Sequence, residues 1–241
     1  MSTSIALVCE TPVDRDTVTI LVHGLLCASV TWIEADSVQS FCSFRGLLAS
    51  EPCLMWEHVP AIAKQYGQRF PGKFKGLPRE AYTAFQALVL LLLISRDRPD
   101  AVLLVRDSSR KESLHQARQA LTTTAPIVIG VAHTKRECWV ITAFEATSDE
   151  ERRLLDEVRR EIGFDPRTNS HELTAKHGDD KHSAKRVLAV LTANSRERET
   201  VALQTIPLDT LRDRGRENGL AEFLAELSAR LLPLFDPRPA G

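Results

Sequence analysis

The apolar run in "DAVLLVRD" (100–107) is the feature that most restricts the fold of this chain. Its apolar residues do not alternate with polar ones, which indicates a β-strand covered on both faces, as in a parallel sheet. The runs "SIALVCE" (4–10) and "APIVIGVAH" (125–133) have the same character. Because helical patterns alternate with these runs, we expect an α/β fold with a mainly parallel sheet flanked by helices.

The expected helices follow the spacing of apolar residues and the capping signals. Asp14 is expected to cap the first helix, and Ser148 with Glu151 forms a capping-box pattern before a later one. The run "ALVLLLLI" (87–94) is too short for a bilayer, which takes about 20 residues, so we expect a buried helix there. The helices are expected at 14–28, 79–95, 111–123, 136–146, 148–164, about 181–193, 208–214 and 217–232.

A change of composition near residue 147 divides the chain into two expected parts. Residues 1–147 hold the apolar runs and are expected to form the α/β core, with one more strand near either 30–35 or 53–57. Residues 148–241 carry charged amphipathic helices, which we expect to pack on that core.

The composition excludes some classes of function. The formal net charge is −1, so binding of nucleic acid would need a local basic patch rather than a global field. The five scattered cysteines contain no CxxC pair, which argues against zinc and favours free thiols in a reducing cytosol. The segment "MSTSIALVCE" lacks the pattern of an export signal, so a cytoplasmic location without membrane association is expected.

Acidic residues fall at or just after the expected strands. Glu10 and Asp107 end two of the strands, Asp14 follows the first, and Glu137 follows the third. Because the carboxyl ends of parallel strands share one edge of the sheet, we expect these carboxylates to converge. Clustered carboxylates suit a hard cation such as Mg²⁺ or Mn²⁺, with Glu10, Asp107 and Glu137 as ligands. The simpler interpretation of any one of them is a helix cap or a solvated loop residue.

Basic residues flank these acids, as a phosphodiester substrate would require. Solvated surface charges are the simpler interpretation of each one. Histidines and aspartates at 177–182 could ligate a transition metal, but their spacing matches no standard motif, and Asp180 is more simply a helix cap. A helix start near 181 would also favour phosphate contact. The candidate phosphate-binding or nucleic-acid-binding residues are Arg106, Arg110, Lys111, Lys135, Arg136, Lys181, Lys185 and Arg186.

The segment "ALVCETPVDRDTV" resembles the first motif of the Toprim fold, which occurs in topoisomerases, primases and OLD-type nucleases. In that motif a strand ends in Glu and an Asp follows four residues later, here Glu10 and Asp14. "LLVRDSS" is similar in position to the family's Asp-x-Asp motif. "VIGVAHTKRECWVITAFE" resembles a further segment of small bacterial Toprim-like proteins, with Glu137 and Trp139. The resemblance covers roughly residues 1–147.

Two positions depart from the family pattern. Thr11 stands where the family usually has Gly, and Ser109 replaces the second acid of Asp-x-Asp. Without that acid a metal loses a charged ligand, so either Glu137 supplies the missing charge, or binding is weak, or the site does not work.

The resemblance implies a divalent-metal-dependent nuclease, with Glu10, Asp107 and Glu137 on the metal, Asp14 in support, and Lys135 or Arg136 on the phosphate. It also implies DNA rather than RNA as substrate, a place as effector in a bacterial antiviral defence system, and an ATPase partner. A homodimer is suggested by the amphipathic segment 219–235. The alternative is a non-catalytic, structural or regulatory Toprim-like subunit of a larger complex. A nucleotide-binding module is a third hypothesis, although no P-loop or GxGxxG motif supports it.

Overall fold

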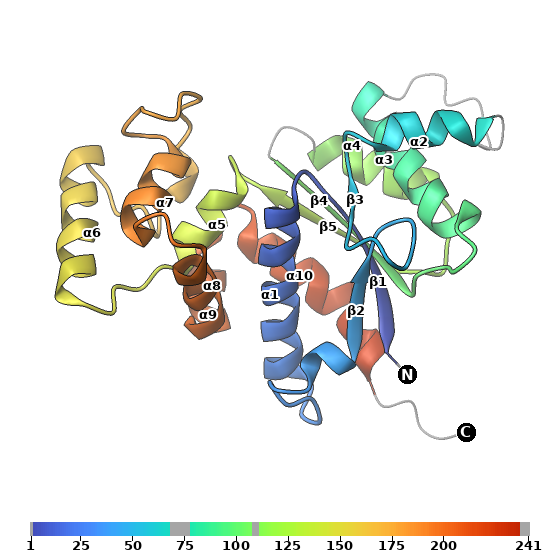
Figure 1. Ribbon diagram of the computed structural model, residues 1–241, viewed down its shortest axis with the longest axis horizontal. Helices are drawn as coiled ribbons and strands as arrows, with labels where there is room; N and C mark the ends of the chain where they lie inside the picture. The colour runs from blue at the N-terminus through green and yellow to red at the C-terminus, as the bar shows by residue number, and fades with distance from the viewer. Residues whose placement is uncertain (1, 68–77, 108–110, 237–241) are drawn as a thin grey trace. The chain divides into compact units, whose positions relative to one another are not determined.

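The sheet expected from the apolar runs is present. A computed structural model describes residues 2–67, 78–107 and 111–236, and it confirms an α/β fold with helices in the C-terminal part (Figure 1). Its strands form a parallel sheet in the order β2-β1-β4-β5, with β3 also paired to β1. The strands described are β1 (Thr3–Cys9), β2 (Cys42–Arg45), β3 (Leu54–Met55), β4 (Ala101–Asp107) and β5 (Ile127–Ala132).

The strands that pair with β1 on the side away from β4 differ in part from those expected. Strand β2 pairs with residues 3–6 of β1, and β3 pairs with residues 8 and 9. The expected strand near 53–57 is therefore confirmed as β3, whereas the alternative at 30–35 is wrong. The sequence of β2, "CSFR", does not predict a strand because only its two end residues are buried.

The helices agree with the sequence patterns in most places. Helices α2 and α8 are additions to the expected set, and α3 continues as one π-helical stretch, Leu90–Ile94. In the described residues, no helix combines the length and apolar character needed to cross a membrane. The helices are α1 (Pro12–Ser29), α2 (Val59–Gln65), α3 (Arg79–Val89), α4 (Lys111–Ala120), α5 (Arg136–Ala143), α6 (Asp149–Ile162), α7 (Ala184–Thr192), α8 (Arg196–Thr205), α9 (Leu208–Arg214) and α10 (Leu220–Arg230).

The chain forms two compact units, residues 1–131 with 225–241, and residues 132–224. The division passes through β5 and α10, whereas the composition suggested a boundary near residue 147. The difference arises from α5, whose sequence is as apolar as that of the core. Helix α5 packs against α7, α8 and α9, so it belongs with the charged helices that follow it.

Both faces of the central strands are buried in the first unit. Ile5–Cys9 of β1 and Ala101–Leu104 of β4 are completely inaccessible to solvent. Alternate residues of these strands, Ala6 and Val8 in β1, join one core cluster with α2, α3 and α4. Figure 1 shows these helices gathered on one side of the sheet, with α1 on the other. This two-sided cover explains why the runs do not alternate.

Charged side chains stabilise the second unit. Ser148 caps α6 as expected, because its hydroxyl accepts a bond from the Glu151 amide at 3.1 Å. The Glu151 carboxylate turns instead to Arg198, whose Nε lies 2.6 Å away, and to the amide of Thr147 at 2.7 Å. The bond from Arg198 is the main cause that lowers the pKa of Glu151 to about 2.

This contact predicts acid sensitivity of the second unit. Because the pKa of Glu151 is lower in the folded chain than its ordinary value of 4.5, its stabilisation is present above pH 4.5 and lost as pH falls toward 2. We expect Glu151→Gln to remove roughly 1–2 kcal/mol of the free energy of unfolding at pH 7 and to flatten its fall below pH 4.5. Urea unfolding at a series of pH values measures both effects. Glu150→Gln, at an exposed neighbouring position, is the control, and an equal loss in both variants would contradict the assignment.

Candidate functional site

Glu10 and Asp107 both stand at the carboxyl edge of the sheet. Strands β1 and β4 are parallel neighbours, with Leu7 opposite Leu103 and Val8 opposite Leu104. Continuing this register by two residues places Glu10 opposite Arg106, and Asp107 is the next residue of β4. Two carboxylates and one guanidinium therefore share the carboxyl edge of the central strands, where open parallel sheets bind ligands.

Arg106 is held between Glu10 and an aromatic ring. Its Nε donates to Glu10 Oε1 at 2.9 Å, and its guanidinium carbon lies 4.9 Å from the centre of the Trp56 ring. The Trp56 indole donates to the carbonyl of Val105 at 2.7 Å, which fixes the ring against β4. The side chain of Arg106 is 18% exposed and that of Glu10 is 38% exposed. In this conformation the charge of Glu10 is balanced by a protein cation that solvent can still reach.

Asp14 acts as part of a helix cap, but not at the position expected. The N-cap of α1 is Thr11, and its hydroxyl accepts a bond from the Asp14 amide at 3.3 Å. The Asp14 carboxylate accepts a bond from the Thr11 amide at 2.8 Å, which completes a capping box. The expectation that Asp14 itself is the N-cap is therefore wrong. Thr11, the departure from the family's Gly, is the residue that starts this helix.

The donor set at this edge fits a hard cation in part. Carboxylate oxygens such as those of Glu10 and Asp107 are the ligands that Mg²⁺ and Mn²⁺ prefer, and Mg²⁺ is often held by one or two carboxylates with water and substrate phosphates. Across residues 2–67, 78–107 and 111–236, no group of three or more His, Cys, Asp and Glu side chains is arranged to hold a metal. The chemistry of the pair fits a hard cation, provided that phosphate and water complete the shell. Ser109, which replaces the second acid, lies with Ser108 and Arg110 outside the described residues.

Glu137, Lys135 and Arg136 belong to the second unit. Lys135 is the N-cap residue of α5, and the half-buried Glu137 lies in the first turn of that helix. Arg136 is only 8% exposed, and its Nη1 donates to Glu199 Oε2 at 2.9 Å. Breaking a buried pair of this kind costs about 3–5 kcal/mol, so Arg136 is less suited than Lys135 to hold a phosphate.

The basic group near residue 181 is mostly engaged with α6. Lys181 Nζ donates to the carbonyl of Glu161 at 3.3 Å, and Arg186 donates to the Glu161 carboxylate at 2.7 Å. Lys185 is exposed. The expected cap Asp180 is wrong, since the N-cap of α7 is Ser183.

The structure adds to what the sequence patterns indicate for two residues of the first unit, Trp56 and Lys111. Trp56 is expected from its residue type to be a core or interface residue, but the guanidinium of Arg106 also lies over its ring. Lys111, expected as a phosphate ligand beside Asp107, is the exposed first residue of α4. The position of Trp56 directly after β3 is the signal that could have placed it at the carboxyl edge.

Comparisons of the chain with protein-family models, with curated proteins and with solved structures give no match. The resemblance to Toprim proteins stays a prediction from the motifs, and the function has to be inferred from the chain's own geometry.

The ion pair predicts competition between Arg106 and a metal for Glu10. We expect Arg106→Ala to bind Mn²⁺ roughly tenfold more tightly than the unchanged chain, because the competing cation is removed. Isothermal titration calorimetry measures the affinity. Arg15→Ala is the matched control, since Arg15 lies in the first turns of α1 and is paired with Asp16. Equal affinity of Arg106→Ala and the unchanged chain for Mn²⁺ would show that Arg106 does not compete with the metal for Glu10.

Proposed function

We propose that this chain is a divalent-metal-dependent phosphodiesterase of Toprim type that acts on nucleic acid. The observation that carries the proposal is the placement of Glu10 and Asp107 at the carboxyl ends of the neighbouring parallel strands β1 and β4, with Arg106 bonded to Glu10. Two carboxylates suit a Mg²⁺ or Mn²⁺ ion, and a guanidinium suits the phosphate that this ion would act on.

Each group has a distinct task in this proposal. Glu10 and Asp107 hold the ion, which when bound would activate water and neutralise charge on the phosphate. Arg106 turns from Glu10 to a phosphate oxygen and keeps its contact with Trp56, whose ring orients the guanidinium. The capping box of Thr11 and Asp14 fixes the start of α1 immediately after Glu10, so the carboxylate is attached to a rigid turn.

The motifs further predict Glu137 as a metal ligand and Lys135 as a phosphate contact, both in the second unit. The exposed Lys111 is a candidate for phosphate contact in the first unit, and the exposed Lys185 is one in the second. The Toprim resemblance further suggests DNA as the substrate, a role as effector in antiviral defence and an ATPase partner. The amphipathic segment 219–235 suggests a homodimer, and the sequence pattern at 1–10 a cytoplasmic location.

A second candidate is suggested by the same ion pair. If the guanidinium of Arg106 permanently takes the place of a metal on Glu10, the charge of Glu10 is balanced without a metal and the edge has no catalytic ion. The chain would then be a non-catalytic, structural or regulatory subunit of a larger complex.

Cleavage of labelled DNA and RNA separates the two candidates. We expect the unchanged chain to cut a labelled DNA with Mn²⁺ or Mg²⁺ and to lose activity in EDTA. Asp107→Asn should reduce the rate at least about a hundredfold, because it removes a charged ligand without changing the shape of the side chain. Asp97→Asn, at an exposed position, is the control.

The absence of cleavage in a folded chain that does not bind Mn²⁺ would favour the non-catalytic subunit. Metal-dependent cleavage that survives Asp107→Asn would instead point to an unrelated contaminating nuclease.

A further inference from the structure

A cavity of about 490 Å³ lies in the first unit, between the segment that connects α4 to β5 and the end of α10. Its position is set by the start of the sheet, because the amide of Val102 at the start of β4 donates to the carbonyl of Pro126, just before β5. Glu10 and Asp107 lie at the opposite, carboxyl ends of the strands. The cavity is therefore separate from the candidate phosphodiesterase site.

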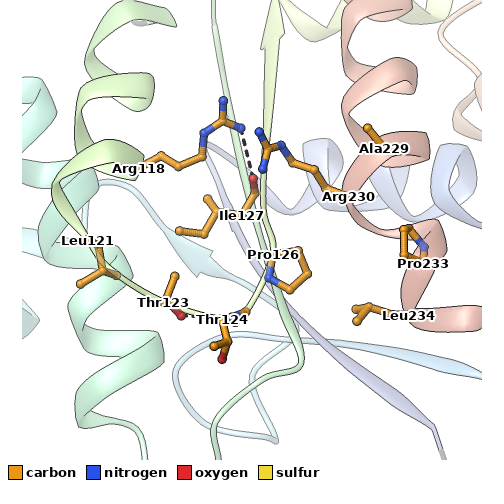
Figure 2. A pocket seen from close by; sticks show the side chains of 11 residues that line it. Arg118, Leu121, Thr123, Thr124, Pro126, Ile127, Ala229, Arg230, Pro233 and Leu234 are labelled. Atoms are coloured by element: carbon orange, nitrogen blue, oxygen red, sulfur yellow. Dashed lines mark hydrogen bonds between the residues drawn. The ribbon is translucent and has the colours of Figure 1, made fainter.

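Two arginines share one carboxylate at this cavity. Arg118 Nη1 lies 2.6 Å from Glu226 Oε2, and Arg230 Nε lies 3.0 Å from the same oxygen. Figure 2 shows the two guanidinium groups together at one end of the cavity. Two positive charges against one negative charge leave an excess of one positive charge there.

The two guanidinium groups differ in how far they are engaged. Arg118 also donates to the carbonyl of Ile127 at 3.2 Å and contacts His115 Nδ1 at 3.1 Å, and it is 17% exposed. Arg230 is 42% exposed, and Glu226 is its partner within the described part of the chain. Its two terminal nitrogens thus present a planar pair of donors, a geometry that matches an oxyanion.

The rest of the cavity is mainly apolar. Leu121, Pro126 and Leu234 are among its lining residues, and Figure 2 shows Leu121 and Leu234 away from the guanidinium end. Thr123 and Thr124 add hydroxyl groups to the lining, at the end away from the guanidinium groups (Figure 2). A charged end, apolar walls, a few hydroxyls and a volume of roughly 300–1,000 Å³ are typical of sites for small organic molecules.

We propose that this cavity binds a singly charged oxyanion, a carboxylate or a phosphodiester, carried on a small apolar body. The anion lies on the terminal nitrogens of Arg230 and is attracted by the excess charge of the pair, and the apolar body contacts Leu121, Pro126 and Leu234. A single negative charge balances the site, since one of the two arginine charges is already balanced by Glu226.

The ion pair of Arg118 with Glu226 is by itself enough to connect α4 to α10. The second arginine is not needed for that connection, and it places a like charge beside Arg118. Arg230 also suits the last turn of α10, where the carbonyl ends of a helix favour a cation. That structural role predicts an effect on stability alone, whereas the proposed site predicts binding.

Titrations followed by two-dimensional ¹H–¹⁵N NMR test the proposal on the full chain. The probes are phenylacetate and diphenyl phosphate, which carry one negative charge on an apolar body as a carboxylate and a phosphodiester. Acetate supplies the charge alone, and benzyl alcohol the apolar body alone. We expect at least one of the two full probes to shift the amide signals of Thr123, Thr124, Ala125, Ile127 and Ala229. We expect that probe to bind at least about tenfold more tightly than acetate or benzyl alcohol.

Variants then assign the binding to the cavity. Arg230→Ala should weaken binding of the tighter-binding probe at least about tenfold. Arg230→Lys should retain only part of the affinity, because lysine keeps the charge but not the planar pair of guanidinium donors. Ala229→Phe should also weaken binding by filling the cavity without removing charge. The control is Arg212→Ala, since Arg212 is likewise 42% exposed and is paired with one carboxylate, Asp209.

Each outcome of these titrations either identifies the anion or overturns the proposal. A preference for phenylacetate assigns the ligand as a carboxylate, and a preference for diphenyl phosphate assigns it as a phosphodiester. The proposal is overturned if neither full probe shifts these signals, if acetate binds as tightly as both, or if Arg230→Ala and Arg212→Ala bind alike.

Discussion

The complete burial of β1 and β4 is the constraint on which the first unit depends. Ile5–Cys9 and Ala101–Leu104 are covered on both faces, so a charged side chain cannot be placed along these strands without a large desolvation cost. Charged groups therefore occur only where the strands end. The same hydrophobic contacts that hold the sheet together thus bring Glu10 and Arg106 to one edge.

The two ends of the sheet carry opposite chemistry. At the carboxyl edge, Glu10 pairs with Arg106, and Asp107 follows Arg106 in β4, whereas near the start of β5 two guanidinium groups pair with one carboxylate, Glu226. One end is thus suited to a cation and the other to an anion. Because the net charge of the whole chain is only −1, a charged ligand would be attracted mainly by these local imbalances of charge.

The fold is more predictable from the sequence than the candidate site. Strands β1, β4 and β5 are predictable because burial on both faces requires a continuous apolar run. Such a run can be recognised without knowing which strand pairs with it. Helix α8 escapes prediction because its buried face includes Glu199, whose partner Arg136 lies 63 residues away in the sequence. The boundary near residue 147 follows composition, whereas packing joins α5 to the second unit.

The candidate site is only partly predictable for the same reason. The rule that parallel strands share a carboxyl edge places Glu10 and Asp107 at the same edge, because β1 and β4 are neighbours. That the two carboxylates converge on a cation stays a prediction. The ion pair of Glu10 with Arg106 joins residues 96 apart, and its ring contact needs Trp56 from a third segment. Such pairings depend on the order of the strands, which local patterns do not contain.

The ion pair also determines how ligands would act on each other at this edge. A cation that takes Glu10 leaves Arg106 without its carboxylate, and an anion that takes Arg106 leaves Glu10 without its guanidinium. Either ligand alone must therefore overcome the ion pair, whereas both together exchange one pairing of opposite charges for two. By thermodynamic linkage, each ligand then strengthens the binding of the other by the same factor. The geometry thus favours binding of a cation and an anion together over binding of either one alone.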